Sequence, residues 1–193
     1  SCEASLAMDD PATAASTLGR LGLIHEKLGD FARAFQYHER ALRAARDRGD
    51  RKLVCAVLNL TGNAYLQVGE FDRALSCYQQ SLAQAREIGH PHDIGLVLQN
   101  IGLARASRDP EAAVPSLLDA LRFSEEAGLS NVVVETLLTL ATTLTQLGRS
   151  DEALGYATRA LSMAESSGSA RLAGTATAMR ETLRQVSAES LPP

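Results

Sequence analysis

Apolar residues recur every three or four positions along most of the chain, which is the spacing of one face of an α-helix. Between Arg51 and Gly89 two such stretches follow one another, separated by the pair Gly69-Glu70. No stretch alternates apolar and polar residues as a half-buried strand would. The pattern therefore predicts an all-α protein with helices over 11–28, 31–48, 51–68, 71–88, 91–107, 110–127, 130–147, 150–167 and 170–188.

The helical pattern itself repeats with a period of forty residues. Three segments that begin at Leu18, Leu58 and Leu137 align without gaps, and glycine or alanine recurs in the same columns. The clearest columns hold Gly22, Gly62 and Ala141; Gly29, Gly69 and Gly148; Ala34, Ala74 and Ala153; Gly49, Gly89 and Gly168. A fixed period in this range indicates a stack of similar helix pairs, which presents one long surface rather than one catalytic pocket.

The period divides the chain into four units with a partial unit at each end. The third unit is one residue shorter than the second, and its turn is Arg108-Asp109-Pro110. Asp109 suits the cap of the next helix and Pro110 its first position. We assign 1–10 to the end of a preceding repeat, 11–50, 51–90, 91–129 and 130–168 to units one to four, and 169–193 to a capping helix and tail.

The last helix has one apolar face and one polar face, as a terminal capping helix needs. The apolar stripe consists of Leu172, Ala176, Met179, Leu183 and Val186. The residues expected to lie away from it, in water, are Arg171, Thr175, Arg180, Arg184 and Gln185.

Composition narrows the function classes. The net charge of −4 is too small to steer the chain toward nucleic acid or an anionic membrane. The longest apolar stretch, near 53–60, is far shorter than a membrane span. Cys2, Cys55 and Cys77 are an odd number without metal-ligand spacing, which favours free thiols in a reducing cytoplasm.

Candidate catalytic and metal-binding motifs are weak. The segment His90-Pro91-His92-Asp93 lies at a helix junction, where Pro and Asp are typical of a helix start. His25 and His38 are interpreted as packing residues, and Glu26 is not expected to pair with the adjacent His25. The chain contains no glycine-rich phosphate loop and no nucleophile elbow. We therefore expect no catalytic residues, no metal and no cofactor.

A basic run occupies the second helix of the first unit and the turn after it. It contains Arg40, Arg43, Arg46, Arg48, Arg51 and Lys52. Acidic residues interrupt the run, and a solvated helix face is its expected role. A small patch that binds phosphate or nucleic acid is the alternative.

Taken together, these columns resemble the tetratricopeptide repeat in its longer, forty-residue form. The residues that carry the resemblance are Leu21-Gly22, Gly29, Ala34 and Ala41; Gly62, Tyr65, Gly69, Ala74 and Tyr78; Ile101-Gly102, Ala113 and Ala120; Gly148, Ala153 and Ala160. The resemblance implies a right-handed superhelix, or α-solenoid, of about four helix pairs plus the capping helix. It also implies a concave groove lined by the first helix of each pair.

Mapped onto this chain, the groove columns give twelve candidate peptide-binding residues. They are Arg20, Leu23, Lys27, Asn59, Asn63, Gln67, Gln99, Asn100, Leu103, Glu135, Thr139 and Thr142. Side-chain amides both donate and accept hydrogen bonds, so they suit a peptide backbone. We expect Asn59, Asn63, Gln99 and Asn100 to make the central contacts and to lie outside the core.

Some members of the family hold the C-terminal carboxylates of a partner with lysines, an arginine and two asparagines. Asn63 and Asn100 fall on the two asparagine columns, but Asn59, Glu135 and Thr139 stand where the cations would be. Without those charges this clamp is not expected to operate.

The sequence thus predicts a non-enzymatic, cytoplasmic module of a larger protein that binds a protein, a peptide or an intramolecular segment in its groove. It is not expected to bind nucleic acid directly or a membrane. The alternative is a sensor domain that binds a small ligand or peptide and controls an attached ATPase or DNA-binding domain. The Arg-rich, Lys-poor composition favours a resemblance to the C-terminal repeats of bacterial, actinobacterial-like regulators.

Overall fold

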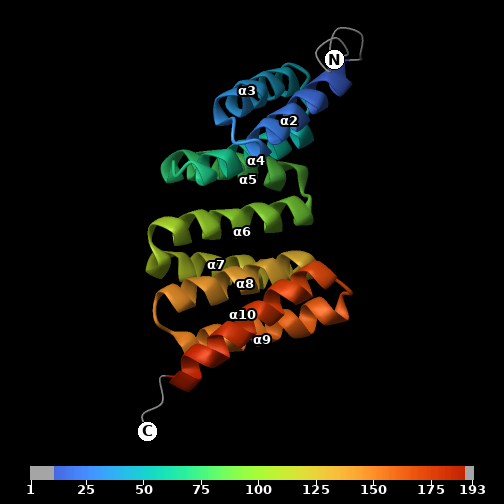
Figure 1. Ribbon diagram of the computed structural model, residues 1–193. Helices are drawn as coiled ribbons and strands as arrows, with labels where there is room; N and C mark the ends of the chain where they lie inside the picture. The colour runs from blue at the N-terminus through green and yellow to red at the C-terminus, as the bar shows by residue number, and fades with distance from the viewer. Residues whose placement is uncertain (1–10, 190–193) are drawn as a thin grey trace. The chain divides into compact units, whose positions relative to one another are not determined.

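The computed structural model describes residues 11–189, with side chains described for 14–185. Within that range the chain forms nine α-helices joined by short turns and no strand (Figure 1). The helices are α2 Pro11–Lys27, α3 Phe31–Asp47, α4 Arg51–Gln67, α5 Phe71–Ile88, α6 Pro91–Arg108, α7 Pro110–Glu126, α8 Ser130–Gln146, α9 Ser150–Ser166 and α10 Ala170–Glu189.

The predicted all-α class is confirmed, and every helix begins and ends within one residue of its predicted bounds. The predicted repeat end over 1–10, the stripe residue Val186 and the tail after Glu189 lie outside the residues whose side chains are described. Within the described range, no helix is both long and apolar enough to cross a membrane.

The turns explain why the helix ends could be predicted so closely. Gly89 ends α5 in the left-handed conformation, with φ of 72°, which a residue with a side chain rarely adopts. Three aspartates then begin the following helices by accepting a hydrogen bond from a backbone N–H three residues further on. These caps are Asp30, Asp50 and Asp109, with distances of 3.1, 3.0 and 3.1 Å.

The chain divides into two compact units, residues 1–97 and 98–193, with the boundary inside α6. In the first unit α2 packs on α3, α3 on α4 and α4 on α5. Its core contains many alanines, among them Ala34, Ala41 and Ala45, each without exposed surface. In the second unit α7, α8, α9 and α10 pack in succession around larger side chains, including Leu117, Leu137 and Leu140.

Each of the first three helix pairs is held together at a glycine. A Cβ added at Gly62 would lie 2.5 Å from the ring of Tyr78, and one added at Gly102 would lie 2.3 Å from Leu117. The backbone of the first helix therefore rests directly on a large side chain of the second. In these three pairs a Cβ at the glycine position would overlap that side chain, so glycine is needed there for the close approach.

The apolar stripe predicted for the last helix is buried. Leu172, Ala176 and Leu183 each expose 2% or less of their surface, packed against the preceding helices of the second unit. Arg180 was expected in water, but its side chain is half-buried and its Nε is enclosed without a hydrogen-bond partner.

Candidate functional site

A groove of the second unit lies along α6, α8 and α10. Two adjoining cavities of about 230 and 470 Å³ share Thr142, Gln146, Thr175 and Met179. We call this continuous channel the threonine groove. Its remaining lining residues are Leu103, Ala106, Ser107, Leu138, Thr139, Thr143, Thr145, Ala178, Thr182 and Leu183. Three of the predicted contact residues, Leu103, Thr139 and Thr142, are therefore brought together here.

The chemistry of this groove follows from how its threonines are bonded. All six lining threonines donate their hydroxyl to the backbone carbonyl four residues earlier, over 2.7 to 3.1 Å. The donors are thus used within the helices, while methyl groups and hydroxyl lone pairs remain for the channel. None of the described residues that line it is charged. The groove is mainly apolar, with hydroxyl acceptors along its walls and the Gln146 amide as a further polar group.

Polar bonds tie the first helices of the second unit to one another beside the groove. Gln99 of α6 donates to Thr139 of α8 over 3.5 Å, and Arg171 of α10 donates to Glu135 of α8 over 2.9 Å. Gln99 and Glu135 were predicted to contact a ligand. In this structure both side chains bond to a neighbouring helix.

The first unit has a smaller groove between α4 and the beginning of α6. Its volume is about 240 Å³, and Asn59 is the predicted contact residue that lines it. Lys52 and Asp93 add charge to a mainly apolar lining of Cys55, Ala56, Leu60, Leu96 and Val97. Burial raises the pKa of the Cys55 thiol, which lies 3.3 Å from the hydroxyl of Ser81. The thiol is therefore protonated, and it is a packing group rather than a nucleophile.

Other predicted residues are used inside the fold. Asn63 accepts a 2.7 Å hydrogen bond from the hydroxyl of Tyr78, and Gln67 donates to Glu26. Arg20 and Lys27 are exposed, and Leu23 is half-buried.

The expectation that all four central amides lie outside the core is wrong for Gln99 and Asn100. They expose only 7% and 9% of their surface. Helices that approach closely leave little room, so a polar side chain between them folds against its neighbours.

Sequence reasoning missed the part of the threonine groove that α10 supplies. Thr175, Ala178, Met179 and Thr182 line the channel, but this helix was interpreted only as a cap with its polar face in water. The signal was present in the register: α10 follows α9 as a further first helix, and threonines recur on its face as on α8. A cap helix that continues the register also continues the groove.

A buried acid lies beside a buried imidazole in the first unit: His38 packs inside the fold as predicted, whereas the burial of Glu26 was not predicted. Glu26 exposes 6% of its surface and His38 none, and Glu26 Oε2 lies 3.9 Å from His38 Nε2. Burial raises the pKa of Glu26 and lowers the pKa of His38. Both groups are buried, and the His38 ring lies directly against Gly22. His25 is likewise a packing residue, stacked on Tyr37 with ring centroids 5.2 Å apart.

The two histidines at the start of α6 lie beside the carboxylate of Asp93. His90 Nδ1 lies 3.2 Å from one oxygen of Asp93, and His92 Nδ1 lies 3.7 Å from the other. Across the described part of the chain, no three His, Cys, Asp or Glu side chains are grouped as metal ligands.

Sequence models of the tetratricopeptide repeat match residues 13–87, 53–126 and 133–167. No curated protein matches the chain.

Among solved structures, the chain is similar to aspartyl phosphate phosphatase F from Bacillus subtilis, with a TM-score of 0.82 and 17% identity over 91% of this chain and 46% of that one. It is also similar to a signal transduction ATPase with a tetratricopeptide repeat sensor from Pyrococcus horikoshii, with a TM-score of 0.80 and 18% identity over 94% of this chain and 28% of that one. A Rap protein complexed with competence and sporulation factor gives a TM-score of 0.74 and 15% identity, over 94% of this chain and 56% of that one.

At sequence identities of 15% to 18%, the similarity to these structures shows a shared fold and does not show a shared function. The chain spans less than half the length of the phosphatase and about a quarter of the length of the ATPase.

Proposed function

The chain belongs to the tetratricopeptide repeat family, and we propose that it is a non-catalytic module that binds a peptide segment of a partner protein in the threonine groove. The partner segment is either a separate protein or another part of a larger parent protein. This places the principal contacts on α8 and α10, with Leu103 of α6 at one edge.

One observation supports this proposal above the others. The two cavities join into a channel whose walls are apolar and whose hydroxyl donors are already used. Such a lining matches a peptide that buries apolar side chains and donates backbone N–H groups to the threonine oxygens. A charged ligand would lose its hydration in the channel without meeting an opposite charge.

Thr142 and Met179 are the residues on which binding should depend most. Both line the two cavities, and they come from the facing helices α8 and α10. Thr142 is exposed and its hydroxyl is bonded only to its own helix, so a larger side chain at that position would enter the channel without disturbing the core.

A random-peptide phage library selected on the purified chain provides the test. Peptides recovered from it should be rich in apolar residues, and Thr142→Trp should weaken their binding by at least about tenfold, the loss of roughly 1.4 kcal/mol of contact. Ser162→Trp is the matched control, because Ser162 is exposed on α9 and lies outside the groove. Fluorescence anisotropy with labelled peptides gives the dissociation constants.

Two results would contradict the proposal. Selected peptides that bind Thr142→Trp as well as they bind the unchanged chain would show that the threonine groove is not the site. A selection dominated by strongly charged peptides would show that the lining has been interpreted wrongly.

A second candidate function is a sensor domain within a regulatory protein. The observation that favours it is the fold-level likeness to the Pyrococcus horikoshii ATPase, whose repeats are described as a sensor. In that case the groove peptide would act as a signal rather than as an anchor. Nucleotide hydrolysis by the complete parent protein, measured with and without a selected peptide, distinguishes the two: an anchoring module leaves the rate unchanged.

We also place the protein in the cytoplasm, because Cys55 and Cys77 are free thiols in the folded chain. Fractionation of the native host with an antibody against the chain tests this, and recovery in the secreted fraction would overturn it.

A further inference from the structure

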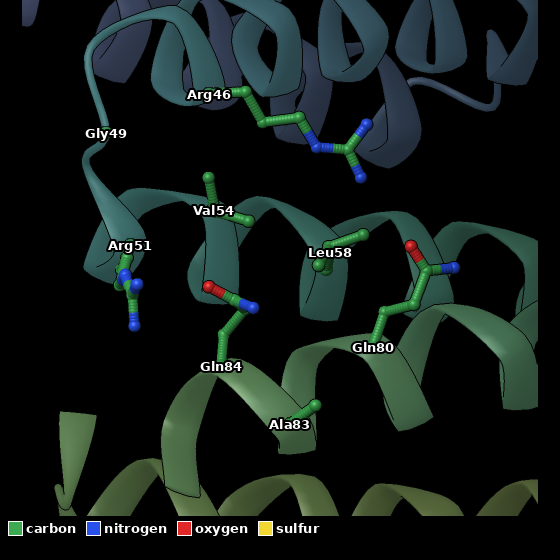
Figure 2. Close-up of a pocket in the computed structure, with 8 residues that line it drawn as sticks. All are labelled: Arg46, Gly49, Arg51, Val54, Leu58, Gln80, Ala83 and Gln84. Carbon is green, nitrogen blue, oxygen red and sulfur yellow. The ribbon is translucent and has the colours of Figure 1, made fainter. Parts of the chain in front are cut away.

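A second pocket of the first unit, separate from both grooves, lies among α3, α4 and α5 and opens to the surface. Its volume is about 330 Å³. Figure 2 shows Arg46 reaching over it from α3, Gln80 and Gln84 pointing toward it from α5, and Val54 and Leu58 of α4 between them. The other lining residues are Gly49, Arg51 and Ala83. It shares no residue with the threonine groove or with the α4–α6 groove.

The pocket combines an apolar floor with polar walls. Val54 and Leu58 expose 7% and 3% of their surface and belong to the core beneath it. Arg46 is exposed and has no hydrogen-bond or ion-pair partner among the described residues, and the Gln84 amide is in the same situation. Gln80 makes only long contacts, of 3.4 and 3.5 Å, to Ser76. Donors are therefore available at the mouth of the pocket.

The corresponding place in the second unit shows what closes such a pocket. Arg46 lies three residues before the turn glycine Gly49, as Glu125 does before Gly128. In the same register Arg159 replaces Gln80 and Met163 replaces Gln84.

These replacements fill the gap in the second unit. Glu125 and Arg159 form an ion pair with one another, and Met163 packs onto the core. The first unit has the same backbone pattern without the ion pair and without the methionine, so its pocket stays open.

The positive charge that remains unpaired at the pocket indicates the charge of its ligand. Arg46 and Arg51 bring two positive charges, and Arg51 is already paired with Glu87. One positive charge therefore remains, which complements a single carboxylate rather than a phosphate dianion. Two amides can donate further hydrogen bonds to the same oxygens, and the apolar floor suits a neighbouring aliphatic side chain.

We propose that this pocket binds an acidic residue flanked by apolar residues on a partner protein, with Arg46 holding the carboxylate. The volume is at the lower end of the range for ligand sites, which fits one anchored side chain and part of its neighbour. The pocket would be a second contact surface, and this proposal does not depend on whether the threonine groove binds a peptide.

The test uses the whole chain and three capped tripeptides: Leu-Glu-Leu, Leu-Gln-Leu and Leu-phosphoserine-Leu. In ¹H–¹⁵N NMR titrations, Leu-Glu-Leu should give saturable shifts confined to residues 46–58 and 80–84. Its affinity should exceed that of Leu-Gln-Leu by about tenfold, since a charge-assisted bond is lost in the latter. Arg46→Gln should cause a similar loss.

Arg86→Gln is the matched control, because Arg86 stands one repeat further on in the same register and does not line the pocket. It should leave binding unchanged. The double variant Arg46→Glu with Gln80→Arg rebuilds the ion pair of the second unit, and it should abolish binding while the chain stays folded.

Three outcomes would overturn the proposal. The first is an absence of saturable shifts with Leu-Glu-Leu, and the second is an equal loss in the Arg46 and Arg86 variants. The third is tighter binding of the phosphoserine peptide, which would assign the pocket to phosphate instead of carboxylate.

Discussion

The first and second repeats place different side chains on the same backbone contact. A Cβ added at Gly22 would lie 2.4 Å from the ring of His38, and one added at Gly62 would lie 2.5 Å from the ring of Tyr78. His38 and Tyr78 are both fully buried. The two helix pairs are therefore closed in the same way by a flat ring against a glycine.

The polar ends of the two rings meet different surroundings. The Tyr78 hydroxyl donates to Asn63 over 2.7 Å, whereas Leu23 stands at the position of Asn63 in the first repeat. Both ring nitrogens of His38 lack a hydrogen-bond partner. The repeat therefore specifies the shape of the contact, while each repeat satisfies its polar atoms separately, and the first repeat leaves two of them without a partner.

The largest expected effect comes from removing the two rings. Tyr78→Ala should lower the free energy of unfolding by about 3–5 kcal/mol, since it empties a large buried volume. His38→Ala should lower the free energy of unfolding by clearly less than Tyr78→Ala does, because two unpartnered buried nitrogens are removed together with the ring. Urea unfolding followed by circular dichroism measures the unfolding free energies of both variants. Equal losses would show that the unpartnered nitrogens of His38 do not weaken the first repeat.

A smaller effect is expected at the glycines. Gly62→Ala should destabilise the chain by about 1–3 kcal/mol, because the new methyl group would overlap the Tyr78 ring. Gly155 of α9 has open space around its Cβ position, so Gly155→Ala should stabilise the helix by roughly 0.5–1 kcal/mol. The opposite signs are the diagnostic result, and a stabilising Gly62→Ala would mean that the helices are not in contact there.

The smallest expected effect is a change in the free energy of unfolding at acidic pH. Burial lowers the pKa of His38 in the folded chain, whereas the unfolded chain takes up a proton near the ordinary value of about 6.5. The unfolded state therefore binds more protons as the pH falls below that value, and stability declines there by at most about 1.4 kcal/mol per pH unit. Above a pH of about 6.5, the stability that the neutral His38 side chain contributes is fully present.

Glu26 changes stability in the opposite direction as the pH falls. Burial raises its pKa, so the folded state takes up the proton more readily than the unfolded state does, and acid favours the folded state at this residue. The clean measurement therefore compares Glu26→Gln with Glu26→Gln carrying His38→Phe, by thermal unfolding between neutral and mildly acidic pH. The variant with Phe should lose less stability in acid. Parallel curves for the two proteins would show that His38 titrates alike in both states.

The helices and turns were accessible from sequence because local signals determine them. Turn glycines such as Gly89 and capping aspartates such as Asp109 act within a few residues of their own position. The glycine columns also predicted a repeat, although their reason, direct contact with a ring or a leucine of the partner helix, became visible only in three dimensions.

The candidate site was only partly predictable, because bonds between helices decide which side chains are available. Leu103 and Thr142 line the threonine groove, whereas Asn63 is bonded to Tyr78 and Gln99 to Thr139. A column position tells where a residue lies on its helix. It does not tell whether a neighbouring helix already occupies the side chain.

The most direct test of the central claim, peptide binding in the threonine groove, is amide hydrogen exchange with and without a peptide from the phage selection. Bound peptide should slow exchange in α8 and α10, with smaller changes in α7 and α9, whose residues do not line the channel. In Thr142→Trp the same concentration of peptide should leave the exchange pattern unchanged. Protection confined to α3 and α5, with none in α8 and α10, would contradict the account.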